Sequence, residues 1–89
     1  MVRMFVWHAV TDFATWKQAY DDFDDERNGM GVAGDAVFQS ASDPDDVTAW
    51  HDFATLDAAR SFAESDRLRE VMAAAGVAGA LQIWFTTQA

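Results

Sequence analysis

Two histidines, His8 and His51, are the residues of this chain best suited to proton chemistry. The ordinary pKa of histidine lies close to neutrality, so its ring can accept or donate a proton at physiological pH. Each histidine lies inside a short apolar run, Met4–Val10 or Val47–Phe53, of the kind that forms a β-strand. Titratable side chains are uncommon inside such runs unless they have a partner or a function. The pair is therefore predicted to act in acid and base catalysis, provided that the fold brings both to one site.

The elements that must position the histidines follow from the apolar pattern. Strands are expected over residues 2–10, 36–41, 47–54 and 81–86. Helices are expected from Thr11 or Asp12 to Asn28, over 56–63, and from Asp66 to Gly76, with a break at Ser65. This order predicts an α+β, ferredoxin-like βαββαβ fold with a four-stranded antiparallel sheet and helices on one face. Its spatial strand order, 4-1-3-2, makes the two histidine-bearing strands neighbours.

Alternation along each strand divides the sheet into two different faces. One face is aliphatic apart from His8 and His51 and matches the apolar stripes of the helices, so it is expected to lie beneath them. The other face collects Trp7, Trp50 and Trp84, and nothing else in the chain is left to cover it. Aromatic patches of this size usually mark an interface. We therefore expect a homodimer in which two copies pack through the Trp7/Trp50/Trp84 face.

Composition limits the class of protein. The chain of 89 residues is predicted to be a single domain, 1–89, and its 51% hydrophobic content argues for a packed globular fold. A net charge of −9 disfavours nucleic acid and anionic membrane surfaces as partners. The first residues lack the pattern of a signal peptide, and no apolar run is long enough to span a bilayer. A cytoplasmic protein is expected.

The segment Phe53–Asp66 carries the strongest local pattern. An aromatic residue ends a strand, a polar cap and small residues follow, then Phe62, and Ser65-Asp66 breaks the helix. This passage resembles the strand-to-helix segment of antibiotic biosynthesis monooxygenase-like proteins of the dimeric α+β barrel superfamily, and the resemblance extends over nearly the whole chain. It implies a dimeric α+β barrel with a pocket in each subunit between the sheet and the helices. The superfamily includes cofactor-independent monooxygenases, isomerases and cyclases, haem-degrading enzymes and non-catalytic members.

The function that the resemblance implies is a cofactor-independent enzyme of monooxygenase, isomerase or cyclase type. His8 and His51 are the expected catalytic residues, and neither a cofactor nor a metal is expected. Haem is set aside because Phe53 stands where haem-degrading members have tryptophan, and Met72 stands where they have the haem-ligating histidine. The residues expected to bind an apolar or aromatic substrate are Trp16, Tyr20, Phe53, Phe62 and Met72.

A second interpretation stays open, in which the chain is a non-catalytic homodimeric module that binds a ligand or serves as a structural unit. The histidines are then held by each other, by a backbone carbonyl or by Tyr20, and the stripe that contains Trp16 and Tyr20 is simply core. This interpretation predicts that side chains fill the space between helices and sheet. The enzyme interpretation predicts a cavity there, lined by His8 and His51.

Overall fold

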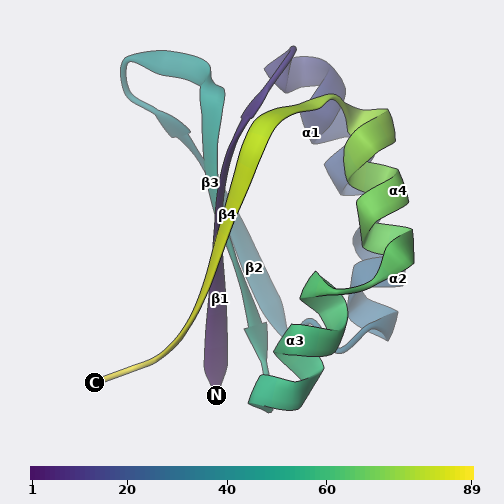
Figure 1. Ribbon diagram of the computed structural model, residues 1–89, viewed down its shortest axis with the longest axis vertical. Helices are drawn as coiled ribbons and strands as arrows, with labels where there is room; N and C mark the ends of the chain where they lie inside the picture. The colour runs from purple at the N-terminus through teal and green to yellow at the C-terminus, as the bar shows by residue number, and fades with distance from the viewer.

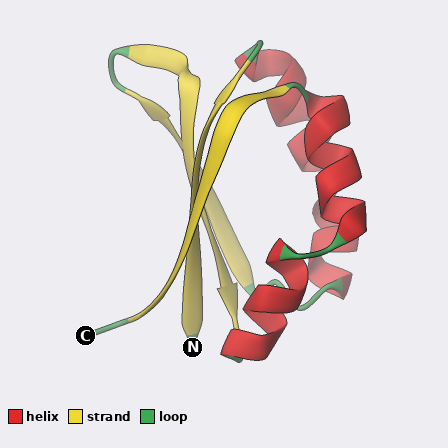
Figure 2. Cartoon of the chain, viewed as in Figure 1, coloured by secondary structure: helices red, strands yellow, loops and turns green.

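The computed structural model describes residues 1–89 as two layers, a sheet and a set of helices that covers one of its faces (Figure 1). The strands are β1 (Val2–Val10), β2 (Gly34–Ser40), β3 (Asp43–Phe53) and β4 (Val77–Thr87). The helices are α1 (Phe13–Asp22), α2 (Asp24–Gly29), α3 (Leu56–Ala63) and α4 (Asp66–Ala75). The four strands are antiparallel in the order β2-β3-β1-β4, and Figure 2 shows every helix on the same side of them. The predicted ferredoxin-like α+β fold is confirmed.

The covered face of the sheet is the one that alternation predicts. Alternate residues of β1 from Val2 to Val10, including His8, are buried beneath the helices, and the same alternation holds in β3. Met4 is the partner of His51 across the β1–β3 ladder, and Val47 is the partner of His8. The two histidines therefore share a face on adjacent strands, but they are separated along the strands by about 13 Å at the usual rise per residue.

The break between α3 and α4 has the cause that the sequence indicates. The Thr55 hydroxyl accepts a hydrogen bond from the Ala58 N–H at 3.1 Å, and the Ser65 hydroxyl accepts one from the Leu68 N–H at 3.3 Å. Each hydroxyl thus satisfies an amide that the first turn of its helix leaves free. None of the four helices combines the length and the hydrophobicity required to cross a lipid bilayer.

The first helical segment differs from its prediction. A single helix was expected up to Asn28, but the structure has two helices that meet at Phe23. The Phe23 N–H lies 3.1 Å from the Ala19 carbonyl oxygen and 3.3 Å from that of Tyr20, so the last turn of α1 tightens there. Because the chain turns at this point, Arg27 reaches back and donates from Nη1 to the Tyr20 carbonyl at 2.6 Å. The apolar stripe does not reveal the break, because Phe23 is buried whether the helix continues through it or ends there.

Three strands begin earlier than predicted, β2 by two residues, at Gly34, and β3 and β4 by four each. β3 starts at Asp43 because the register between β2 and β3 shifts near Gln39. The shift leaves Pro44 without a ladder partner in β2, so the N–H that proline lacks costs the sheet no hydrogen bond there. β4 starts at Val77 because Gly79, with φ +69°, takes up a register shift against β1. Pro, Ala and Gly are poor strand formers, so the pattern alone places the starts of β3 and β4 too late.

Gly76 supplies a test of how the end of α4 is fixed. Gly76 has φ +86°, and a Cβ at this position would lie 2.5 Å from Oγ1 of Thr11. Gly76→Ala is expected to lower the free energy of unfolding by about 1–2 kcal/mol through its left-handed backbone, with the crowding against Thr11 in addition. Gly79→Ala is the matched control, because its φ is +69° but the space around it is open. Urea unfolding should show a larger loss for Gly76→Ala, and equal losses would exclude a contribution from Thr11.

Candidate active site

An apolar cavity of about 60 Å³ lies between the sheet and the helices. On this measure a single buried water requires roughly 10–15 Å³, so side chains do not fill the space. Of its 15 lining residues, 12 are hydrophobic, and the remaining three are His8, Arg27 and His51. A largely apolar space with a small number of polar groups is the usual composition of a small-molecule site.

Most of the predicted site residues meet at this cavity. Those that line it are His8, Trp16, Tyr20, His51, Phe62 and Met72. Phe53 does not, which corrects the expectation that it shapes the cavity. Phe53 pairs with Val2 at the end of the sheet, is fully buried, and packs its ring 5.3 Å from that of Phe62. Phe53 therefore lies behind Phe62, which lines the cavity, and packs against it.

The two histidines have separate environments. Nδ1 of His8 lies 3.2 Å from the carbonyl oxygen of Ala9, an arrangement in which the ring nitrogen donates, and the ring meets Trp16 edge-on at 5.4 Å. Burial lowers the pKa of His8 below its ordinary value. His51 contacts Tyr20 instead, at the other end of the cavity. The histidines thus share a cavity without being hydrogen-bonded to each other.

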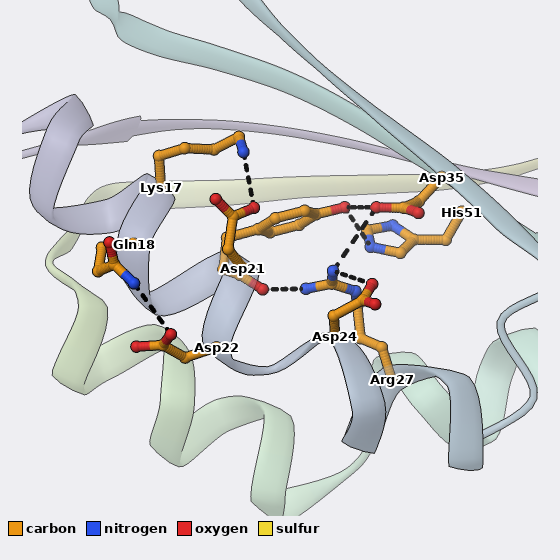
Figure 3. Close-up of polar contacts among 9 residues, drawn as sticks. Lys17, Gln18, Asp21, Asp22, Asp24, Arg27, Asp35 and His51 are labelled. Carbon is orange, nitrogen blue, oxygen red and sulfur yellow. Dashed lines mark hydrogen bonds and ion pairs between the residues drawn. The ribbon is translucent and has the colours of Figure 1, made fainter.

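The hydrogen bonds of Tyr20 determine which nitrogen of His51 carries the proton (Figure 3). The Tyr20 hydroxyl is bonded to Oδ2 of Asp35 and lies 3.3 Å from Nε2 of His51. A carboxylate only accepts, so Tyr20 donates its O–H to Asp35 in a hydrogen bond, and His51 must donate from Nε2 to the Tyr20 oxygen. Nδ1 of His51 then carries a lone pair, and it is buried without a protein partner.

Arg27 fixes this cluster from the helix side. Only 2% of its surface is exposed. Its guanidinium carbon lies 3.7 Å from the centre of the Tyr20 ring, and Nη2 lies 3.0 Å from Asp24 Oδ1 and 3.6 Å from Asp35 Oδ2. A buried charge requires such partners, because it has lost its hydration.

Sequence reasoning missed Asp35 and Arg27, although a signal existed for each. The stripe Trp16, Tyr20, Phe23 continues at the next helical spacing to Arg27, which places a charged residue where an apolar one is expected. Asp35 is the ladder partner of His51, and alternation along β2 puts its side chain on the helix-covered face. In both cases a charged residue on the buried face was the indication.

Solved structures share this architecture over nearly their whole length. A protein from Bordetella bronchiseptica that is assigned as an antibiotic biosynthesis monooxygenase superposes with a TM-score of 0.82, at 17% identity, over 99% of this chain and 96% of that chain. SnoaB from Streptomyces nogalater, a cofactor-independent oxygenase, superposes with a TM-score of 0.76, at 11% identity, over 99% and 94%. This chain has the antibiotic biosynthesis monooxygenase-like fold. No protein-family model and no curated protein matches its sequence.

Within this antibiotic biosynthesis monooxygenase-like fold, burial sets the protonation of the site. Burial lowers the pKa of His51 to about 4, and the positive charge of Arg27 lowers it further in the same direction. Burial and the hydrogen bond to Asp35 raise the pKa of Tyr20 above its ordinary value. At neutral pH His51 is therefore neutral and Tyr20 keeps its proton, as the hydrogen bonds require. No group of three or more His, Asp or Glu side chains is arranged to hold a metal ion.

The low pKa of His51 predicts a loss of stability in mild acid. Between about pH 4 and the unfolded value near 6.5, the unfolded chain binds a proton that the folded chain does not, so stability falls as pH decreases through this range. From pH 7 to pH 5 the His51 contribution is about 2 kcal/mol. Urea unfolding at both pH values should show this loss, and His51→Gln, which keeps a donor near the Nε2 position, should show clearly less of it. An unchanged pH dependence in His51→Gln would contradict the assignment.

Proposed function

We propose that this protein is a cofactor-independent enzyme of monooxygenase type that acts on a small, apolar or aromatic molecule bearing a hydroxyl group. The observation that carries the proposal is the buried, unpartnered Nδ1 of His51, a residue that lines an apolar cavity. A hydroxyl is the ligand group that complements such an acceptor. The fold shared with SnoaB, a cofactor-independent oxygenase, supports oxygenation over isomerisation or cyclisation.

His51 is the proposed general base. Nδ1 takes the substrate's hydroxyl proton, while Nε2 stays bonded to Tyr20. In the empty cavity a pKa of about 4 makes His51 a weak base, but the anion left on the substrate lies beside the new imidazolium and raises that pKa. Asp35 stabilises the imidazolium through the shared Tyr20 hydroxyl. The substrate thus arrives neutral, and the charges separate only inside the cavity.

An electron-rich aryloxide supplies the electrons that dioxygen requires. For 1-naphthol, a C–O bond forms at C4, the O–O bond breaks, and the O–H and C4–H hydrogens leave with the second oxygen atom as water. The products are 1,4-naphthoquinone and water, so no external reductant is consumed. Trp16, Phe62 and Met72 line the apolar cavity and, with the substrate bound there, keep bulk water away from the reactive anion. His8, tied to the Ala9 carbonyl, is proposed to orient the far end of the substrate.

Dioxygen consumption with 1-naphthol tests this reaction, with a chelator present and the spontaneous rate subtracted. His51→Gln is expected to lower kcat/KM by about 10²-fold or more, the usual contribution of a positioned base. Tyr20→Phe is expected to lower it by a smaller factor, because it removes the link to Asp35. Arg69→Ala is the control, since Arg69 pairs only with the exposed Asp66 on α4. Full activity in His51→Gln would exclude it as the base.

The alternative function is binding without turnover, and one observation favours it. A pKa of about 4 suits His51 to accepting a hydrogen bond more than to removing a proton. Calorimetric binding of 1-naphthol that is lost in His51→Gln, with no dioxygen consumption by the wild type, would establish this alternative and reject the oxygenase.

We also propose that the uncovered face of the sheet packs on a second copy of the chain. Trp7 and Trp84 are 41% and 44% exposed there, and Trp84 stacks on Phe5 with ring centres 5.6 Å apart. Two polar contacts on this face lie within the chain, since Arg3 and Asp52 form a bidentate ion pair and Trp7 Nε1 donates to Asp46. The face is therefore largely apolar, and burial of its aromatic side chains favours contact between two copies that each carry a net charge of −9.

Sedimentation equilibrium tests the dimer. Wild-type protein is expected to be dimeric at micromolar concentration, and Trp84→Glu is expected to weaken association by more than 100-fold because it places a charge within the apolar patch. Leu56→Glu, at an exposed site on α3, is the control for the added charge. A monomeric wild type, or a Trp84→Glu variant that associates normally, would contradict the proposal.

A further inference from the structure

Helix α4 is held by different contacts at its two ends. At its C-terminal end, the Thr11 N–H donates to the carbonyl oxygen of Gly76 at 2.9 Å, and Thr11 packs closely against that glycine. At its N-terminal end, Arg67 donates to Glu26 of α2 from Nε and Nη2, at 2.8 and 2.7 Å. This ion pair is the only hydrogen-bonded contact between α4 and α2. One end of α4 is thus fixed through the backbone, and the other through two exposed side chains.

α4 also forms the outer wall of the cavity. It runs beside α1 and α2 on the covered side of the sheet (Figure 1) and contributes four lining residues. Three of these four, Leu68, Val71 and Met72, are only partly buried, whereas His8 and His51 on the sheet are buried. The cavity therefore comes closest to solvent beneath α4.

From these contacts we infer that α4 is the gate of the cavity and that the Glu26–Arg67 ion pair holds this gate closed. When the pair separates, the N-terminal half of α4 swings away from α2, while the end at Gly76 stays in place. The inference rests on the proposed function only for the premise that small molecules enter this cavity. It adds a control of their entry that responds to salt.

Both connections of α4 permit such a movement. On the N-terminal side, α3 ends at Ala63 and Ser65 caps a new helix, so α4 can turn without unwinding α3. The Ser65 hydroxyl accepts from the Leu68 N–H at 3.3 Å, which lets the cap move together with α4. On the C-terminal side, Gly76 tolerates changes in backbone angle that a residue with a side chain would oppose.

The ion pair has the strength that a reversible closure requires. The side chains of Arg67 and Glu26 are 53% and 48% exposed. An exposed pair of this kind shifts an equilibrium by about 2–5-fold, and salt weakens it. The guanidinium carbon of Arg67 also lies 5.8 Å from the ring centre of Phe23, which lines the cavity. The contact that closes the gate is therefore adjacent to the cavity and easily broken.

Exchange of fluorobenzene, followed by fluorine NMR on the whole protein, tests the gate. Glu26→Gln keeps the size of the side chain and removes its charge, so entry and exit rates are expected to rise together by about 2–5-fold. The dissociation constant should change little, because the ion pair lies outside the cavity. Raising NaCl from about 0.02 to about 0.5 M should speed exchange in the wild type but not in Glu26→Gln.

Arg69→Gln is the matched control, because it removes an ion pair that lies entirely within α4. It is expected to exchange fluorobenzene at the wild-type rates and to keep the wild-type response to salt. Wild-type rates in Glu26→Gln would overturn the inference, and so would a wild-type protein that does not bind fluorobenzene.

A cross-link tests whether α4 is the part that moves. The chain contains no cysteine, so a double variant with Glu26→Cys and Arg67→Cys has only the two introduced thiols. Bridging them with a short bis-methanethiosulfonate is expected to slow the exit of fluorobenzene by roughly 10-fold or more, and dithiothreitol should reverse the effect. The same reagent on Asp66→Cys with Arg69→Cys, both within α4, is the control. Unchanged exchange after bridging α2 to α4 would contradict the gate.

These results are separable from the reaction. Faster exchange in Glu26→Gln supports the gate whether or not the protein consumes dioxygen with 1-naphthol. Dioxygen consumption by a protein whose fluorobenzene exchange ignores both Glu26→Gln and salt would support the oxygenase and overturn the gate.

Discussion

The burial of one guanidinium is the constraint on which the site depends. Arg27 comes from α2, donates to a carbonyl of α1, stacks on Tyr20 and faces Asp35 on β2, so it joins three elements at one point. Tyr20 in turn holds His51 of β3. A charge without hydration needs all of these partners at once, so the positions of the helices and the strands are coupled through it.

That coupling determines the chemistry available at His51. Arg27 and burial keep the imidazole neutral, and the Tyr20–Asp35 pair chooses its tautomer. The outcome is a neutral imidazole whose free lone pair is buried away from water. Such an arrangement lowers stability in the absence of a ligand, because an unpaired buried acceptor has lost its hydrogen bonds to solvent. Retaining that cost is typical of sites organised for a partner molecule.

Most of the fold could be predicted from local pattern, and the site only in part. Alternation placed His8 and His51 on the covered face, because a side chain on a strand has only two directions to choose from. Periodicity was less informative at Phe23, where a continuous and a broken helix bury the same residue. Phe53 shows that a place on the covered face does not by itself put a residue at the cavity. Its position at the end of the strand places it behind the cavity wall. Arg27 and Asp35 were missed because their partners come from distant segments, and a single sequence does not state those contacts.

The irregular register at the two sides of the sheet limits how copies of this chain can assemble. β2 and β4 are the outer strands, and each departs from regular pairing, near Gln39 in one case and at Gly79 in the other. An outer strand with a shifted register and a left-handed glycine is a poor template for a further strand. Growth of the sheet sideways into an open-ended fibre is thereby discouraged at both ends. The proposed self-association uses the uncovered face of the sheet instead, and a contact made by the same face on both partners closes after two copies.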